Sequence, residues 1–196
     1  MSNTTKAKRK KERKKRAATM TSPVISDDHI AGVNQRASLR TGDDPILKVV
    51  CKSVDCRAIT DPKSGISCCI KNMKSVLLRS KDGVGLSANQ AGYDDRIILV
   101  KALGVIITMI NPVVTDHAEE KIAATEGCLS YPGESKRVSR YRWVEVEWVD
   151  EYGEERKDIF GRKTSRIIQH ELDHLEGMCQ VHEFKLESIG VPKWLV

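Results

Sequence analysis

The spacing of apolar residues along the chain predicts two amphipathic helices. Between residues 64 and 78, apolar side chains recur at positions i, i+3, i+4 and i+7, which gives a helix one buried face. The stretch Lys81-Asp82-Gly83 ends this helix. A second helix is predicted from Gly161 to Glu176, with Gly177 as its stop. Its apolar face carries Ile167, Ile168, Leu172 and Leu175.

Short strands are predicted between the two helices. Residues 96–100 and 105–110 form two β-like runs, and Asn111-Pro112 ends the second one. From residue 142 to residue 148 apolar and polar side chains alternate, and a turn at residues 150–153 follows, which is typical of a β-hairpin. One helix, several short strands and a late helix together predict an α+β fold.

The first 40 residues are predicted to be a disordered basic tail, and residues 41–196 a single domain. The tail has no sustained apolar period, so it cannot bury enough apolar surface to offset the entropy lost on ordering. Residues 1–17 carry nine basic side chains and one acidic one, a net charge of +8. The remaining chain has 24 basic and 26 acidic side chains, so the overall charge of +6 belongs to the tail.

The composition predicts a soluble cytoplasmic protein with reduced cysteines. Hydrophobic residues make up 40% of the chain and charged residues 31%, as in globular proteins. No apolar run approaches the roughly 18 residues that a membrane helix needs, so no membrane partner is expected. The N-terminus lacks the apolar stretch of a signal peptide, and its dense lysines are unlike a transit peptide. The six cysteines are therefore expected to be free thiols in a reducing compartment.

The second predicted helix contains the clearest candidate for chemistry, the segment His170-Glu171-Leu172-Asp173-His174. Residues i and i+4 share a helix face, so both imidazoles can reach one metal ion, and Glu171 beside them can reach a water in the same site. Chance occurrence on a polar helix face is the alternative. The core positions next to the two histidines favour the metal site.

A catalytic metal site of this type needs a third protein ligand. The best candidate is Cys128, within Glu126-Gly127-Cys128-Leu129-Ser130, although a buried free thiol is the ordinary state of such a cysteine. A Gly-rich segment, residues 83–90, follows the first predicted helix. The reversed order of helix and loop argues against a dinucleotide-binding loop, and favours a loop along which a peptide backbone can lie, with the Gln90 amide as a donor.

Together these three segments resemble the signatures of the peptide deformylase family, which has a Gly-rich motif ending in Gln, a Glu-Gly-Cys-Leu-Ser motif and a Gln-His-Glu-x-Asp-His helix. All three occur here in that order, and the resemblance extends from about Asp44 to Phe184. Ser87 departs from the alanine that is usual in the family. The basic tail has no counterpart, and the C-terminus is too short for the long terminal helix of many bacterial members.

The resemblance implies an α+β fold around a central metal-binding helix, and an enzyme that removes the formyl group from the initiator methionine of nascent polypeptides and releases formate. Cys128, His170 and His174 would bind one divalent metal, most often Fe(II) in the family, with Zn, Ni or Co as alternatives. Glu171 would act as the general base. Gln90 and the backbone N–H of Leu129 would stabilise the oxyanion.

The resemblance also suggests where the substrate lies. The nascent chain would bind as an extra strand beside the Gly-rich segment, along Val84, Gly85 and Gly127. Val84 and Ile167 would line the methionine pocket, unless both are simply core residues.

Two other functions remain open at this level. A zinc endopeptidase could use the same histidine pair with Glu176, His182 or Glu183 as third ligand, but it would leave the Cys128 segment unexplained. An RNA- or ribosome-associated factor is suggested by the run from Lys6 to Arg16, although such a run can be a solvated tail. The two ideas combine in an enzyme whose tail contacts ribosomal RNA, in the cytoplasm of a bacterium or of a cell infected by a bacteriophage.

Overall fold

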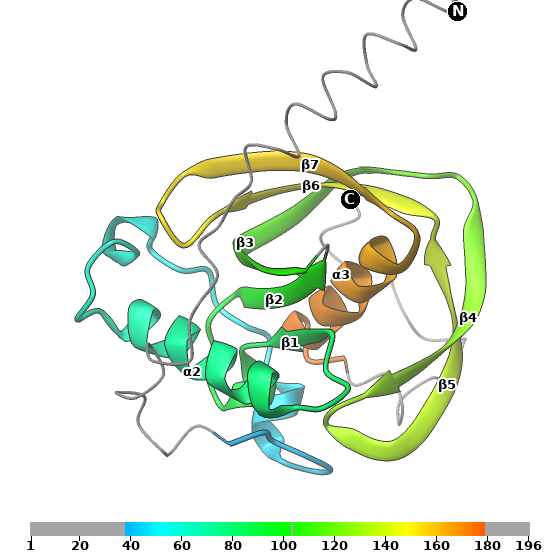
Figure 1. Cartoon of the computed structure of the whole chain (residues 1–196), viewed down its shortest axis with the longest axis horizontal. Helices are drawn as coiled ribbons and strands as arrows, with labels where there is room; N and C mark the ends of the chain where they lie inside the picture. The colour runs from blue at the N-terminus through cyan, green and yellow to red at the C-terminus, as the bar shows by residue number, and fades with distance from the viewer. Residues whose placement is uncertain (1–37, 103, 179–196) are drawn as a thin grey trace, which may run out of the picture.

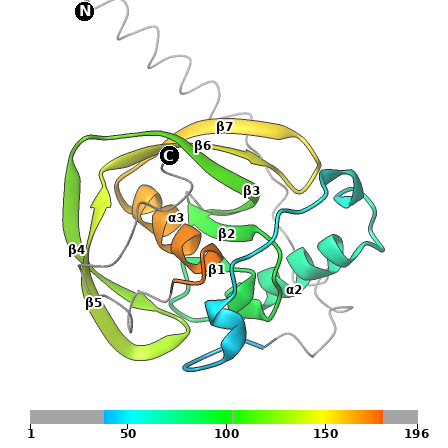
Figure 2. The ribbon, with the colours of Figure 1, turned by 180° about the vertical axis from the view of Figure 1, so that it is seen from behind.

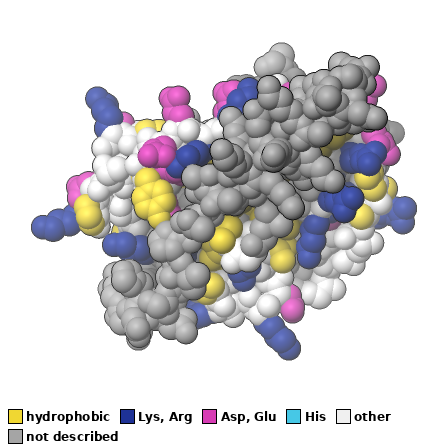
Figure 3. Space-filling model, turned by 45° about the horizontal axis from the view of Figure 1, so that its top comes forward, with side chains coloured by type: hydrophobic (Ala, Val, Ile, Leu, Met, Phe, Trp, Pro, Cys, Tyr) yellow, Lys and Arg dark blue, Asp and Glu magenta, His cyan; other side chains and the backbone are white. Residues whose placement is uncertain are grey.

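The computed structural model describes residues 38–102 and 104–178 (Figure 1). The predicted tail, apart from its last residues, and the segment after residue 178 lie outside the described residues. Within the described ranges, no helix has the length and apolar character to cross a membrane. Basic and acidic side chains are both scattered over the face seen in Figure 3, in keeping with the nearly balanced charge of the sequence after the tail.

The first predicted helix is α2, Gly65–Arg79. Ser64 is its N-cap, and the Ser64 hydroxyl accepts a hydrogen bond from the Ser67 N–H at 3.1 Å, which satisfies one of the free donors of the first turn. The buried face of α2 includes Cys69, Met73 and Leu77, as the spacing predicts.

Five antiparallel strands form the main sheet, in the order β1-β2-β3-β6-β7. Their bounds are β1 Gly85–Ser87, β2 Ile97–Ala102, β3 Val105–His117, β6 Trp143–Val149 and β7 Glu155–Gly161. The predicted hairpin is β6–β7, paired from Trp143↔Gly161 to Val149↔Glu155. Val144 and Val146 are buried on the face that the alternation assigned to them.

The predicted end of the second strand at Asn111-Pro112 is wrong, because β3 continues to His117. The register against β6 shifts between Ile110 and Val113, so the break is absorbed as a β-bulge. Asn111 adopts a left-handed backbone with φ 51°, and its side-chain amide bonds the N–H and the carbonyl of Val54 at 2.8 and 2.9 Å. Pro112 lacks a donor, and the irregular pairing at the bulge accommodates it.

A second, two-stranded sheet was not predicted. It consists of β4 Lys121–Cys128 and β5 Tyr131–Tyr141, and is called the ribbon below. Its strands carry many small and charged residues, with Gly127 and Gly133 interrupting the pattern, so hydrophobic periodicity does not reveal them. Three short 3-10 helices complete the described elements: η2 Pro45–Lys48, η3 Cys56–Ala58 and η4 Asn89–Ala91.

The second predicted helix is α3, Arg162–Leu175, and Gly177 after it has φ 71°. Strand β2 is buried on both faces: Ile97 and Leu99 belong to the core with α2, and Ile98 and Val100 to the core with α3. Both views show α3 enclosed between the sheet and the ribbon (Figures 1 and 2). The predicted α+β fold around a central helix is confirmed, and both motif-bearing segments upstream of α3 lie against it.

Candidate active site

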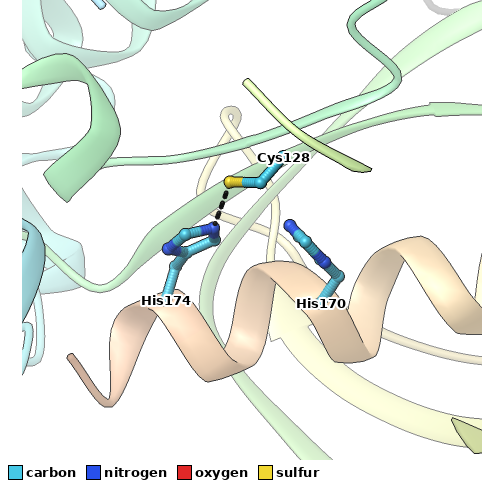
Figure 4. Close-up of side chains that lie close together, drawn as sticks. All are labelled: Cys128, His170 and His174. Atoms are coloured by element: carbon cyan, nitrogen blue, oxygen red, sulfur yellow. Dashed lines mark hydrogen bonds between the residues drawn. The ribbon is translucent and has the colours of Figure 1, made fainter. Parts of the chain in front are cut away.

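The three predicted metal ligands lie together at the point where the ribbon meets α3. His170 and His174 stand one turn apart on α3, and Cys128 at the end of β4 approaches them from the facing strand (Figure 4). Cys128 Sγ is 3.2 Å from His174 Nε2, and one ligand atom from each residue falls within 4.8 Å of the others. One sulfur and two imidazole nitrogens form a donor set that suits a divalent transition metal with an open position for substrate.

Glu171 lies beside this set in the protein interior. It is 4% exposed, and its Oε2 has no hydrogen-bond partner among the described residues. Burial raises the pKa of Glu171 to about 7, because a charged carboxylate is poorly solvated there. A buried oxygen without a protein partner is costly unless a water or a substrate group completes its bonding. Glu171 is therefore placed to exchange a proton with a molecule in the site.

The Gly-rich segment forms β1 and η4 and borders the ligand set through Gln90. Gln90 Nε2 donates to Ser130 Oγ at 3.1 Å and lies 3.5 Å from Cys128 Sγ. Gln90 Oε1 accepts the Ser87 N–H at 3.0 Å and lies 3.1 Å from Ser87 Oγ, which fixes which end of the amide faces the site. Leu129 follows Cys128 in the tight turn between β4 and β5 and is half-buried.

The predicted substrate residues occupy different surroundings. Gly85 lies against Glu171 and Ile167, Val84 is 37% exposed directly before β1, and Gly127 is exposed on the ribbon. Ile167 is buried in the core beneath α3. Gly85 therefore lies in the terminal strand of the sheet and also contacts Glu171, the candidate base.

Both the sequence and the fold match known proteins. The sequence profile described as polypeptide deformylase matches residues 37–188. The peptide deformylase of Natranaerobius thermophilus is 36% identical over 141 residues, which are 71% of this chain and 86% of that protein. The chain belongs to the peptide deformylase family. Peptide deformylases are metal-dependent hydrolases that remove the N-formyl group from nascent polypeptides, and the predicted family, enzyme class and function are confirmed at this level.

Two further relatives define the extent of the similarity. The peptide deformylase of Synechocystis is 40% identical over 107 residues, which are 52% of this chain and 57% of that protein. A crystal structure of the class I type b peptide deformylase from Acinetobacter baumannii, with Met-Ala-Ser bound, superposes with a TM-score of 0.65. Its sequence identity is 28%, over 71% of this chain and 92% of that one.

The endopeptidase alternative has no support in the described site of this deformylase. Glu176, one of its candidate third ligands, is engaged by Arg96 at 2.8 Å. His182 and Glu183 lie outside the described residues. Cys128, upstream of the helix, is the residue that reaches the histidine pair.

A buried charge network lies behind the candidate ligands and has no signal in the sequence. The Glu126 carboxylate accepts two hydrogen bonds from Arg140 at 3.0 Å each, and its Oε2 lies 3.0 Å from His170 Nδ1. Arg140 also pairs with Asp173 and donates to the Gln169 carbonyl at 3.2 Å. Glu126 stands out in the sequence only as part of a motif, and Arg140 gives no local signal, because its partners are 14 and 33 residues away.

Burial and this network shift the pKa values of the groups around the site. Burial opposes the charge of Glu126, but bonds from His170 and Arg140 lower its pKa to about 2. Burial lowers the pKa of His174, which favours the neutral imidazole that ligates metals. Burial acts in the same direction on His170, yet bonds to Cys128 and Glu126 raise its pKa to about 10. The surroundings of the two imidazoles therefore favour opposite charge states.

Proposed function

We propose that Cys128, His170 and His174 hold one divalent metal ion, and that Glu171 is the general base that this deformylase uses to hydrolyse the formyl amide. The observation that carries the proposal is the unpartnered Oε2 of buried Glu171 beside the three converging ligand atoms. A divalent ion in such a site supplies a polarised carbonyl and a more acidic water. The chain itself supplies the proton transfer, the oxyanion donors and the substrate alignment.

Glu171 takes a proton from the attacking water and returns one to the departing amine, so that formate and a free methionine amine leave. A pKa of about 7 suits both halves of this exchange, because the group gains and loses a proton near neutral pH. The geometry supports this role through Gly85, whose missing side chain makes room for the carboxylate beside β1.

Gln90 and the Leu129 N–H are the proposed oxyanion donors. Gln90 Nε2 already faces Cys128 Sγ at 3.5 Å, and the Ser87 N–H at Gln90 Oε1 favours that orientation of the amide. Removal of one such donor typically lowers kcat by about 100- to 1,000-fold.

Formyl-methionyl nascent chains are the proposed substrate, bound as an added strand along β1. In the described sheet β1 is a terminal strand that pairs only with β2, and the proposal places the extended peptide at its other edge, beside Gly85. Gly127 on the ribbon would flank the same peptide, and Val84 and Ile167 would contact the methionine side chain. The Acinetobacter baumannii enzyme has been crystallised with Met-Ala-Ser bound, which supports a methionyl peptide as the ligand.

Fe(II) is the proposed native metal, with Zn, Ni or Co as alternatives. A ferrous ion next to the Cys128 thiolate would make the enzyme sensitive to oxygen. We expect the iron-loaded enzyme to lose activity in air and the nickel-loaded enzyme to keep it. Equal activity of the purified native enzyme in air and under nitrogen would count against iron.

The decisive experiment measures formate release from a formyl-Met tripeptide after anaerobic loading with Fe(II) or Ni(II). Glu171→Gln should keep stoichiometric metal and lose at least about 100-fold in kcat, because the ligands remain and the base is lost. Cys128→Ala should lose metal. Turnover of Glu171→Gln within a few-fold of the wild-type rate would contradict the proposed base.

The basic run from Lys6 to Arg16 is proposed to contact ribosomal RNA in the cytoplasm, where nascent chains emerge. Lysine-rich segments bind polyanionic RNA without sequence preference, and this binding weakens steeply with salt. The full chain should co-sediment with ribosomes at low salt, and a chain starting at Pro45 should not. Equal sedimentation of both chains, insensitive to salt, would contradict the proposal.

A further inference from the structure

One face of α3 meets the ribbon at three successive levels. Arg166, His170 and His174 are spaced four residues apart, so they lie along one side of the helix. Arg166 bonds β4 at the Ile122 carbonyl, His170 bonds Glu126, and His174 contacts Cys128. His170 and His174 are proposed metal ligands, whereas the proposed mechanism does not use Arg166.

The Arg166 guanidinium joins both strands of the ribbon to the helix. It donates to the carbonyl of Ile122 on β4, to the carbonyl of Val138 on β5 at 2.9 Å, and to Glu126 Oε1 at 2.5 Å. The planar guanidinium has several fixed donors, so one side chain can serve three acceptors. The Arg166 side chain is 17% exposed, which makes it the most accessible member of this charge network.

The ribbon requires such contacts because its own pairing does not hold it in place. It is a two-stranded sheet, separate from the five-stranded sheet in the described residues, and isolated two-stranded sheets are only marginally stable. Cys128 is the one ligand of the set that the ribbon contributes. The turn after Cys128 is held by Gln90 at Ser130 Oγ and by the Gly42 N–H at the Ser130 carbonyl, and the rest of the ribbon is held on α3 by side-chain bonds. The position of the Cys128 sulfur relative to the two imidazoles therefore depends in part on the bonds between the ribbon and α3.

Arg140 and Arg166 both supply these bonds, but their removal has different consequences. Loss of buried Arg140 would leave Glu126 and Asp173 charged without their main partner. Loss of Arg166 leaves Glu126 with both Arg140 bonds and the His170 contact. The contribution of Arg166 to the site can therefore be measured without a general loss of folding.

We infer that Arg166 is a positioning residue of the metal centre: it holds the ribbon on α3 and so keeps Cys128 Sγ against the histidine pair. The inference rests on the proposed ligand set. Its consequence is metal retention, because a thiolate whose strand can move away from α3 dissociates more often. Arg166 takes no part in substrate binding or proton transfer.

The test uses the full chain loaded with Co(II), whose thiolate charge-transfer absorption reports the bond to Cys128. Metal release to a chromogenic chelator should be about 10-fold faster in Arg166→Gln than in wild type, in line with the effect of residues that support metal ligands. The charge-transfer band should also weaken. Arg166→Lys should be intermediate, because an ammonium keeps the charge near Glu126 but cannot span both carbonyls.

Lys163→Gln is the matched control. Lys163 is an exposed cation in the first turn of the same helix, without a hydrogen bond or ion pair to the described residues, so its loss changes the charge alone. It should release metal at the wild-type rate. Metal release from Arg166→Gln at the wild-type rate would overturn the inference. This holds even if the melting temperature of the variant falls, because the Arg166 contacts would then stabilise the fold without positioning the metal ligand.

Cys128→Ala separates this inference from the proposed ligand set. Loss of the charge-transfer band in Cys128→Ala, together with wild-type release from Arg166→Gln, would overturn only the role of Arg166. An unchanged band in Cys128→Ala would remove Cys128 from the ligand set, and the inference about Arg166 would fall with it.

Discussion

Gly85 lies directly against the carboxylate of Glu171. A Cβ built on Gly85 would stand 2.3 Å from Glu171 Oε1 and 2.7 Å from Ile167 Cγ2, both far inside van der Waals contact. The glycine in β1 is therefore a spatial requirement of the candidate base, in addition to any contact it makes with a peptide.

Gly85→Ala should nearly abolish turnover, because the added methyl group must displace Glu171 or push β1 outward. A displacement of about 1 Å in such a site can cost about 100-fold in rate, and we expect at least that loss in kcat for formate release. Gly65→Ala is the control, since a Cβ there meets no atom within 4 Å. Activity of Gly85→Ala close to that of Gly65→Ala would show that the contact is relieved without cost.

Ser87→Ala should lower kcat by about 2- to 10-fold with little change in KM, the equivalent of one ordinary hydrogen bond. The Ser87 hydroxyl lies 2.7 Å from Asn89 Oδ1 and 3.1 Å from Gln90 Oε1, so it helps to orient the proposed oxyanion donor. The backbone N–H of residue 87 remains as a donor, which limits the effect. Steady-state kinetics check this prediction, and a change in KM alone would contradict it.

Arg140→Met should destabilise the fold by ~3–5 kcal/mol, because it removes the buried cation that pairs with both Glu126 and Asp173. Urea unfolding measures the free energy. Arg142→Met is the matched comparison on the neighbouring residue, where both partners of the pair with Glu120 are 60% exposed. That substitution should cost no more than ~1 kcal/mol. Similar losses for the two variants would mean that the buried network contributes little.

Thiol reagents should distinguish two neighbouring cysteines. Cys68 is exposed on α2, whereas Cys69 is buried and its thiol pKa is raised by burial. Burial also raises the pKa of Cys51 to about 12. With iodoacetamide at pH 8, Cys68 should react in the native protein, and Cys51 and Cys69 only after unfolding. Peptide mapping by mass spectrometry checks this order, and early modification of Cys69 would contradict it.

Local periodicity was sufficient for part of the fold. The helices α2 and α3 and the hairpin β6–β7 follow from spacings of 3.6 and 2 residues within short windows. The ribbon β4–β5 has no such pattern, since few of its side chains enter the core. The Asn111-Pro112 break was misjudged because its bulge depends on Val54, 57 residues away.

The sequence by itself determined the pieces of the candidate active site. The i, i+4 spacing puts His170 and His174 on one helix face, and three short motifs identify the family. Only the tertiary structure decided how these pieces meet: Cys128 reaches His174 across 46 residues, Gly85 makes room for Glu171, and Arg140 and Arg166 join the ribbon to α3. The physical reason is the separation of the interacting residues along the chain. Periodicity reports the face that one element buries, whereas ion pairs and close contacts form between elements whose separation along the chain leaves no local pattern.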